Sequence, residues 1–505
     1  MTPPALRATS PFEWGGGLNI WSDEGGQTMS VVKRHAGDRA HLVRLAEATG
    51  DLALLASFTE KRPSIVERLA EGKALRDQVP RADPVAILEQ QNVSRVQRLV
   101  PVRFARMLAT PFAFLRGSAA VMAGDLAGTP ATGLFVNACG DMHVSNFGVF
   151  ASAERNLVFA INDFDEIHPG PWEWDLKRLA ASAAVAARFM GGDRDKAADA
   201  ARAIVRSYRK RIRRFAEMGH LEVWYNRIDE RAVLDTLSAK ARRRAERAMA
   251  KAREKGHVRA LDKMTEEVDG EHRIIEEVPL IVRETHAEDG TPINEALDVV
   301  LRSYIESLAM DRLKLLSRYR IVDVARKVVG VGSVGTGCWV VLLKGADNDD
   351  PLFLQVKEAQ ASVLAPYVEG TLPFKNHGKR VVMGQHLAQG APDIFLGWGR
   401  VNDKDFYVRQ LADMKGSIAF GEGDTGQLET FEEYCALCGW ALALAHAKSG
   451  DAALIAGYCG NSPELDDAIA KFALAYARQT DKDHETLDKA RRSGRIRVAT
   501  EQVVK

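Results

Sequence analysis

The sequence is short of cysteine and of excess charge. Its five cysteines (Cys139, Cys338, Cys435, Cys438 and Cys459) are odd in number and scattered over 505 residues. A secreted disulfide framework needs a denser and usually even set, so we expect the reducing cytoplasm. Lys and Arg total 69 against 68 Asp and Glu. Because nucleic-acid binding depends on an excess of cationic side chains, this balance argues against a nucleic-acid partner.

Long apolar runs are also missing. No segment approaches the roughly 20 apolar residues needed to cross a bilayer. The longest candidate, LAASAAVAARFMGG from Leu179, is Ala-rich and is typical of a buried helix. The first residues lack the charged and apolar regions of a signal peptide. We therefore expect a soluble cytoplasmic protein without a membrane partner.

What the sequence does contain is ordinary globular composition, with 46% hydrophobic and 27% charged residues. Its length exceeds that of a usual single domain. The periodicity of apolar residues changes along the chain and predicts an α+β protein. The expected segments are a flexible leader (1–40), a helical segment (41–130), strands with polar clusters (131–192), a large helical insertion (193–300), a β-rich segment (301–425) and a helical tail (426–505).

Polar clusters follow two strand-like runs. GLFVNACG leads into Asp141-Met-His143-Val-Ser-Asn146, and NLVFAIN leads into Asp163-Phe-Asp165. An Asn five residues after an Asp is the spacing of the protein-kinase catalytic loop. In that loop the Asp reaches the proton of the attacking hydroxyl while the Asn holds a metal ion. Carboxylates after the second strand suit Mg²⁺, which prefers oxygen ligands. We predict Asp141 and His143 as catalytic residues, and Asn146, Asp163 and Asp165 as metal ligands.

Three phrases, CGDMHVSN, INDFD and GPWEWDL, resemble the signature of the aminoglycoside- and choline-kinase-like phosphotransferases. That signature reads roughly H-G-D-x-H-x-x-N, I-D-[FW] and G-D-P-x-x-D-L. The resemblance implies Asp141 as the base, Asn146 and Asp163 as metal ligands, and Asp175 as a capping residue that buttresses the loop. Cys139 stands where the signature usually has His. His143 stands where protein-serine kinases carry Lys, which favours a small-molecule acceptor.

The chain resembles more closely a bacterial family of uncharacterised proteins, domain of unknown function 2252. The resemblance spans about residues 72–480 and is carried by VPVRFARM, PFAFLRG, GDMHVSNFG, NDFDE, GPWEWDLKRLA, VGSVG, LQVKEA, DIFLGW and FYVRQL. This second resemblance implies no activity.

A glycine cluster lies between two strand-like runs, VARKVV and CWVVLLKG. It contains Gly330, Gly332, Ser333 and Gly335. A dinucleotide fold requires a helix after such glycines, whereas CWVVLLK has β character. Strand, glycine turn and strand form the phosphate-covering flap of kinases. We therefore predict that these residues bind ATP.

Lys357, in LFLQVKEA, resembles the strand lysine that pairs with nucleotide phosphates. Burying a lysine in an apolar strand is costly without an anionic partner. Glu358 and Glu369 are both candidates for its ion pair. Arg116, in PFAFLRG, is a candidate for a phosphate contact, with a purely structural role as the alternative.

The order of these parts differs from that of ordinary kinases, because the flap and lysine follow the catalytic loop by some 190 residues. A circularly permuted kinase-like core is the interpretation we favour. A rival is that residues 95–135 form a reduced first lobe and that the C-terminal β region is separate. Asp451 could also be the catalytic aspartate, but Ala456 stands where its Asn is needed.

Three functions remain open. The leading one is an ATP- and Mg²⁺-dependent phosphotransferase acting on a small-molecule hydroxyl, whose acceptor we expect residues 193–300 to select. The second is a non-catalytic, nucleotide-binding pseudokinase. The third is a phosphoesterase with two metal ions bound by Asp141, His143, Asp163, Asp165 and His168.

Overall fold

The computed structural model describes residues 83–500 except 288–289, 348–349, 369–373 and 412–413. The expected leader at 1–40 lies outside these residues, as does the first part of the helical segment. Helices and antiparallel strands alternate along the described chain, which confirms the predicted α+β class.

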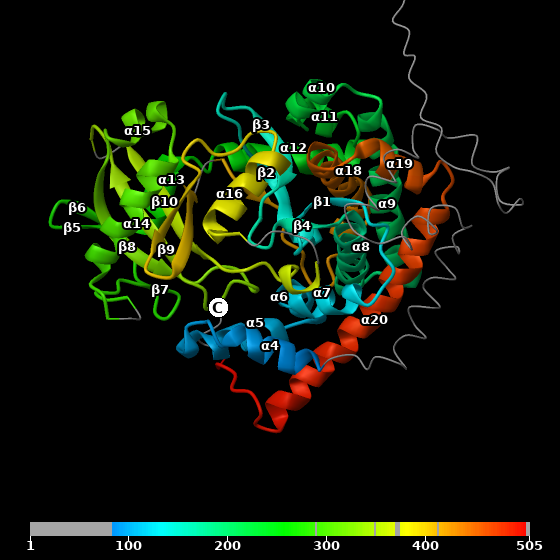
Figure 1. Ribbon diagram of the computed structural model, residues 1–505, viewed down its shortest axis with the longest axis horizontal. Coiled ribbons are helices and arrows are strands. Elements are labelled where there is room, and N and C mark those ends of the chain that lie inside the picture. Colours follow the sequence, from blue (N-terminus) through cyan, green and yellow to red (C-terminus); the bar gives the residue numbers. More distant parts are fainter. Residues whose placement is uncertain (1–82, 288–289, 348–349, 369–373, 412–413, 501–505) are drawn as a thin grey trace, which may run out of the picture. The chain divides into compact units, whose positions relative to one another are not determined.

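The largest sheet has six antiparallel strands in the order β11-β12-β10-β9-β8-β7 and lies on the left of Figure 1. Its strands are β7 (Ile281–Val282), β8 (Arg320–Lys327), β9 (Cys338–Lys344), β10 (Pro351–Ala359), β11 (Gly397–Val401) and β12 (Lys404–Gln410). Because successive side chains point to opposite faces of a strand, β9 serves two cores. Val341 packs with residues of α14 (Ile293–Ser307), and Val340 packs with residues of α13 (His257–Met264).

Helix α16 (His377–Ala388) is a difference from the β-rich character predicted for residues 301–425. The side chain of Asn376 accepts a hydrogen bond from the backbone N–H of Lys379 and caps the helix. A second difference is the hairpin of β5 (Thr265–Val268) and β6 (Glu271–Ile274), which lies inside the segment expected to be helical.

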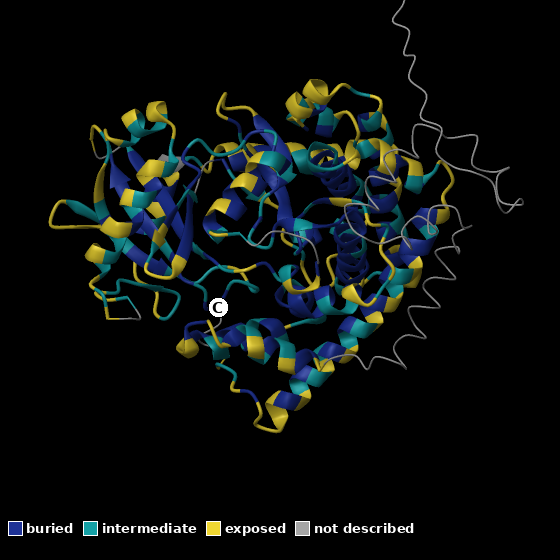
Figure 2. Cartoon of the chain, viewed as in Figure 1, coloured by how far each residue is buried: buried dark blue, intermediate teal, exposed yellow. Residues whose placement is uncertain are grey.

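Helix α8 (Trp172–Phe189) lies at the centre of the helical part of the chain and is buried along most of its length (Figure 2). Its alanines leave room for close packing against α9 (Arg194–Ala216) and α20 (Glu464–Arg492). The expectation of a buried helix from Leu179 is therefore confirmed. No helix of the described residues has the length and apolar content that a membrane span requires.

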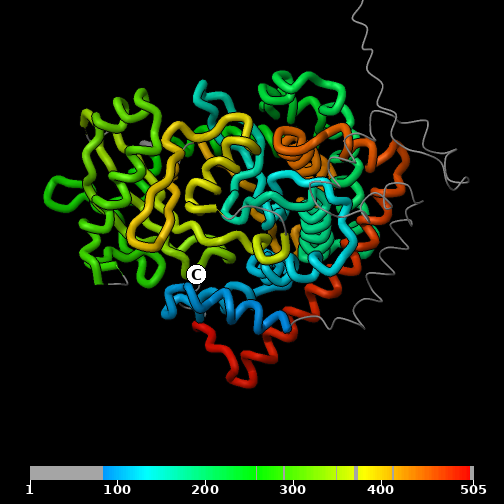
Figure 3. Tube along the Cα trace, in the orientation of Figure 1, coloured from blue at the N-terminus to red at the C-terminus, as the bar shows by residue number. Residues whose placement is uncertain are grey.

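The first described helices pack against the last one. Arg495, just beyond α20, forms ion pairs with Asp83 at 2.7 Å and Glu89 at 2.6 Å. Figure 3 shows the two ends of the described chain side by side. The early helices are α4 (Pro84–Asn92), α5 (Val100–Leu108), α6 (Pro111–Gly117) and α7 (Ala119–Ala127).

The remaining elements connect these parts. The strands are β1 (Phe135–Ala138), β2 (Phe147–Ala151), β3 (Leu157–Ile161), β4 (His168–Pro171) and β13 (Gly416–Ser417). The helices are α10 (His220–Tyr225), α11 (Glu230–Leu234), α12 (Ala239–Arg253), α15 (Met310–Leu316), α17 (Thr425–Leu428), α18 (Phe431–Ser449) and α19 (Ala452–Cys459).

Candidate functional site

A cavity of about 340 Å³ lies between two stretches that are far apart in the sequence. One is the glycine loop, residues 328–337 between β8 and β9, and the other is the aspartate loop, residues 139–146 after β1. The cavity is lined by most of the predicted site residues, namely Asp141, His143, Asn146, Asp163, Asp165, Gly330, Gly332 and Ser333. The tertiary structure thus brings both sequence motifs to one cleft.

The aspartate loop is held by the first turn of α8. The Asp175 carboxylate accepts hydrogen bonds from the backbone N–H groups of Cys139 at 2.6 Å and Gly140 at 2.9 Å. Gly140 has φ +73°, and a Cβ there would lie 2.9 Å from the carbonyl oxygen of Glu166. The buttressing role that the resemblance implied for Asp175 is confirmed. Its expected place as the N-cap is wrong, because α8 already begins at Trp172.

Asp141 is oriented by a buried arginine. Its carboxylate accepts hydrogen bonds from Nε of Arg178 at 3.1 Å and from Nη2 of the same side chain. Asn146 Nδ2 donates to the backbone oxygen of Asp141 at 2.7 Å. Burial raises the pKa of Asp141, although Arg178 opposes this. The group can therefore exchange a proton closer to neutral pH than an exposed aspartate.

His143 lies beside this carboxylate but is not bonded to it. Its Nε2 is 3.9 Å from Asp141 Oδ2, and its buried Nδ1 has no hydrogen-bond partner. Burial lowers the pKa of His143 well below its usual value. A neutral imidazole at the edge of the cleft can donate or accept a hydrogen bond, but it adds no charge.

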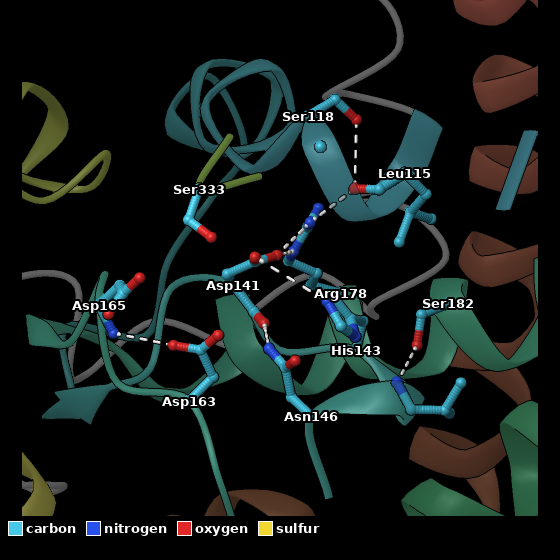
Figure 4. A network of polar contacts seen from close by, with 12 residues as sticks. Leu115, Ser118, Asp141, His143, Asn146, Asp163, Asp165, Arg178, Ser182 and Ser333 are labelled. Atoms are coloured by element: carbon cyan, nitrogen blue, oxygen red, sulfur yellow. Dashed lines mark hydrogen bonds and ion pairs between the residues drawn. The ribbon is translucent and has the colours of Figure 1, made fainter. Parts of the chain in front are cut away.

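Asp163 and Asp165 follow β3 and have different surroundings. In Figure 4, Asp163 lies between Asp165 and Asn146, and its Oδ1 accepts the backbone N–H of Asp165 at 3.3 Å. Burial and the neighbouring Asp165 charge raise the pKa of Asp163. Asp165 instead forms an ion pair with Lys357, and its Oδ1 accepts a hydrogen bond from the Tyr407 hydroxyl at 2.7 Å. Burial acts to raise the pKa of Asp165, but Lys357 and Tyr407 outweigh it and hold that pKa below its usual value.

This difference separates the predicted metal ligands. Asp165 already has a cationic partner, whereas Asp163 and Asn146 face the cleft together. No group of three or more His, Cys, Asp and Glu side chains within the described part of the chain is placed to hold a metal ion. An Asp–Asn pair of oxygen ligands suits Mg²⁺, which keeps several waters and takes the remaining ligands from a substrate's phosphates.

The glycine loop lies directly on the Asp141 side of the cleft. A Cβ on Gly332 would be 3.2 Å from the Arg116 carbonyl oxygen and 3.9 Å from Asp141 Oδ2. Ser333 lies on the same side, above Asp141 in Figure 4. Gly330 has φ +68°, a conformation that favours glycine. The loop backbone therefore comes close to Asp141, which the Asp–Asn spacing predicts to be the catalytic base.

Two predicted nucleotide-binding residues, Gly335 and Lys357, do not line the cavity. Gly335 packs against Arg95, since a Cβ at this glycine would be 3.1 Å from that of Arg95. Lys357 is 3% exposed and points to Asp165. Glu358, the next residue, accepts the Gly337 N–H at 2.9 Å. The prediction of Glu358 as the partner of Lys357 is wrong because adjacent strand residues point to opposite faces; the other candidate, residue 369, lies outside the described residues.

Arginines from α5, α6 and the segment after α4 form another wall of the cleft, and two of them were not predicted from the sequence. Arg95, Arg103 and Arg116 all line the cavity. Arg103 is buried and donates to Asn92 Oδ1 at 2.5 Å and to the Gly117 carbonyl oxygen at 3.1 Å. Arginines placed among apolar residues, as in VSRVQRLVPVRFARM, were the available signal. Among the described residues that line this cavity, none comes from 193–300.

Comparison with known proteins identifies the family. A family model described as "Uncharacterized protein conserved in bacteria (DUF2252)" matches residues 95–490. The chain belongs to this family. The matched residues of this DUF2252 member include both loops, Lys357 and the arginine wall. No curated protein and no solved structure matches the chain.

Proposed function

We propose that this protein is an ATP- and Mg²⁺-dependent phosphotransferase with a kinase-like core that acts on the hydroxyl of a small molecule. The observation that carries the proposal is the shared cleft. Asp141, the Asn146–Asp163 pair and the glycine loop line one cavity although the loops are some 190 residues apart. Phosphoryl transfer depends mainly on positioning and electrostatic stabilisation, which this set of groups can supply.

Each group has a distinct role in this proposal. The ionised Asp141 carboxylate, oriented by Arg178, accepts the proton of the acceptor hydroxyl. Asn146 and Asp163 would hold Mg²⁺, which would neutralise charge on the phosphates. The backbone N–H groups of the glycine loop approach those phosphates without intervening side chains. Lys357 acts as a positioning residue, because its ion pair fixes Asp165 two residues from the metal ligand.

Chain order supports a permuted core. The glycine loop, the lysine strand β10 and helix α16 follow one another, as a kinase-like nucleotide lobe requires. Ser449, at the end of α18, accepts a hydrogen bond from the Asn137 N–H of β1 at 3.2 Å. The path from the sheet through α18 therefore continues in space into β1 and the aspartate loop. The rival first lobe at 95–135 is not favoured, because its described elements are almost entirely the helices α5–α7.

A second candidate is nucleotide binding without turnover. Helix α16 places Arg380, not a glutamate, beside the Lys357–Asp165 pair, where its Nη2 donates to the Asp165 carbonyl oxygen at 2.8 Å. In kinases a glutamate of this helix pairs with the strand lysine. Here Arg380 connects α16 to Asp165 instead. The phosphoesterase is not favoured, because His168 is bonded to the Pro169 carbonyl oxygen at 2.7 Å and does not line the cleft.

The direct test is ADP formation by the purified full-length protein with Mg²⁺-ATP and a panel of hydroxyl acceptors. Asp141→Asn should lower turnover by about 10²- to 10⁴-fold, since the general base is lost. Nucleotide affinity should change little. Asp451→Asn is the matched control, because Asp451 is an exposed N-cap of α19 and asparagine caps equally well.

The pH dependence gives a second readout. Transfer requires ionised Asp141, so turnover should fall as the pH falls through the raised pKa of this group, above the usual aspartate range. Absence of nucleotide binding would contradict the proposal. Tight binding without turnover over the whole panel would favour the second candidate instead.

A further inference from the structure

Arg116 is a half-buried cation that lines the cleft. It lies near the end of α6, and its Nε is inaccessible to solvent and makes no hydrogen bond. Within the described residues, its guanidinium group forms no hydrogen bond or ion pair. Burial lowers the pKa of Arg116, while the charges of Asp141 and Asp163 act to raise it. Partial burial of a charge that makes no ion pair is unfavourable, so a ligand that supplies an anion at this point would stabilise the protein.

Arg95 extends the same wall. It is 9% exposed, and Nη1 donates to the Val334 carbonyl oxygen at 2.6 Å, but its buried Nε has no hydrogen-bond partner. Arg95 and Arg116 line one cavity together with Gln90 and Ser94. This wall comes from α4, α6 and the segment after α4, while the groups proposed to bind the donor come from the glycine loop and the segments around β2 and β3. The cationic groups therefore lie next to the glycine loop, on the part of the cavity wall that α6 and the segment after α4 supply.

We propose that Arg116 and Arg95 form an acceptor subsite for a small molecule carrying a phosphate or carboxylate group, with its hydroxyl turned to Asp141. The inference rests on the proposed function and names the acceptor class for it. In the transfer, the acceptor oxygen gives its proton to Asp141 and bonds to the γ-phosphorus. The bond from that phosphorus to the β–γ bridging oxygen breaks, and ADP leaves with the electron pair. The cavity of about 340 Å³ suits a small acceptor.

The test uses inorganic phosphate as the probe, with the full-length protein saturated with Mg²⁺-ADP so that the α- and β-phosphate positions of the donor are filled. Phosphate should bind, and Arg116→Gln should weaken it by about tenfold or more, as expected for a lost charge-assisted contact. Arg116→Lys should have an intermediate effect. Arg98→Gln is the control, because Arg98 belongs to the same N-terminal segment but is 60% exposed and pairs with Glu284 outside the cleft.

Unfolding temperatures show whether the variants are folded. Arg116→Gln should unfold close to the wild-type temperature, since the side chain makes no hydrogen bond or ion pair within the described residues, and phosphate should raise the midpoint of the wild type more than that of Arg116→Gln. Equal phosphate binding by wild type and Arg116→Gln, or none by either, overturns the inference. Weaker binding of a non-hydrolysable ATP analogue to Arg116→Gln, with ADP affinity unchanged, also overturns it by placing Arg116 on the donor's terminal phosphate.

The two proposals fail differently. If the wild type binds no nucleotide, the phosphotransferase proposal fails and the acceptor assignment fails with it, whereas Arg116-dependent phosphate binding measured without nucleotide would still show the anion site. If nucleotide binds and ADP forms while phosphate binding is independent of Arg116, only the subsite is wrong.

Discussion

At the scale of single residues, the Lys357–Asp165 pair joins the two parts of the cleft. The lysine belongs to β10 and the aspartate follows β3, and their side chains are 3% and 25% exposed. Such a buried pair is a weak source of net stability, but breaking it from one side leaves an uncompensated charge. The pair therefore fixes the position of the Asp163–Asp165 segment more than it strengthens the fold.

Lys357→Met should lower the free energy of unfolding by about 3 kcal/mol, because Asp165 then loses its ion pair and keeps the hydrogen bond from the Tyr407 hydroxyl. Lys357→Met/Asp165→Asn should lose less than the two single changes together. Urea unfolding measures the free energy of unfolding of the two single variants and of the double variant. Lys489→Met, at an exposed pair on α20, should change the free energy by less than about 0.5 kcal/mol. Strict additivity of the two cleft substitutions would show that the pair is not coupled.

At the scale of elements, the glycine loop was predictable because its determinants are local. Glycines between two β-type runs specify a turn, and the strands on either side are β8 and β9. Helix α16 was missed because two adjacent valines suggested a strand. What decides for a helix is the cap at Asn376 together with packing of α16 against β11 and β12. Propensity is a weak guide where tertiary packing overrides it.

Gly332→Ala tests whether this loop must approach Asp141 closely. The new Cβ would lie 3.2 Å from the Arg116 carbonyl oxygen, so the loop should shift and its N–H groups should move from the phosphates. We expect about tenfold weaker binding of Mg²⁺-ATP with nearly unchanged stability, measured by calorimetry and thermal unfolding. Gly457→Ala in α19 is the control, because a Cβ there meets nothing within 4 Å. Unchanged affinity in Gly332→Ala would argue against a phosphate-binding loop.

At the scale of the whole molecule, all five cysteines are buried and free. Cys435 and Cys438 lie on α18 within the large core that surrounds α8. Burial raises the pKa of both thiols well above the usual value. Neither a disulfide nor a metal-ligand role is needed to explain them.

A thiol reagent that reacts with the thiolate should therefore find almost no reactive cysteine in the native protein, and all five in urea. The rate of labelling at intermediate urea should follow global unfolding, since the cysteines are distributed over elements of the main cores. Rapid labelling of one thiol under native conditions would contradict this prediction, because it would show that the protein opens locally around that cysteine. Colorimetric thiol titration measures the number of reactive cysteines in the native protein and in urea.

The sequence by itself determined what depends on neighbours along the chain: the strand-like runs, the glycine turn, the Asp141–Asn146 spacing and the buried Ala-rich helix. It also carried the resemblance that the family comparison bore out. Only the tertiary structure decided that Lys357 pairs with Asp165, that Asp163 and Asn146 line the same cleft, and that arginines from the first part of the described chain line it. The Lys357–Asp165 contact joins residues 192 positions apart, and the Arg95–Val334 contact joins residues 239 positions apart. No local pattern encodes them, because they depend on how sheet and helices pack around one cleft.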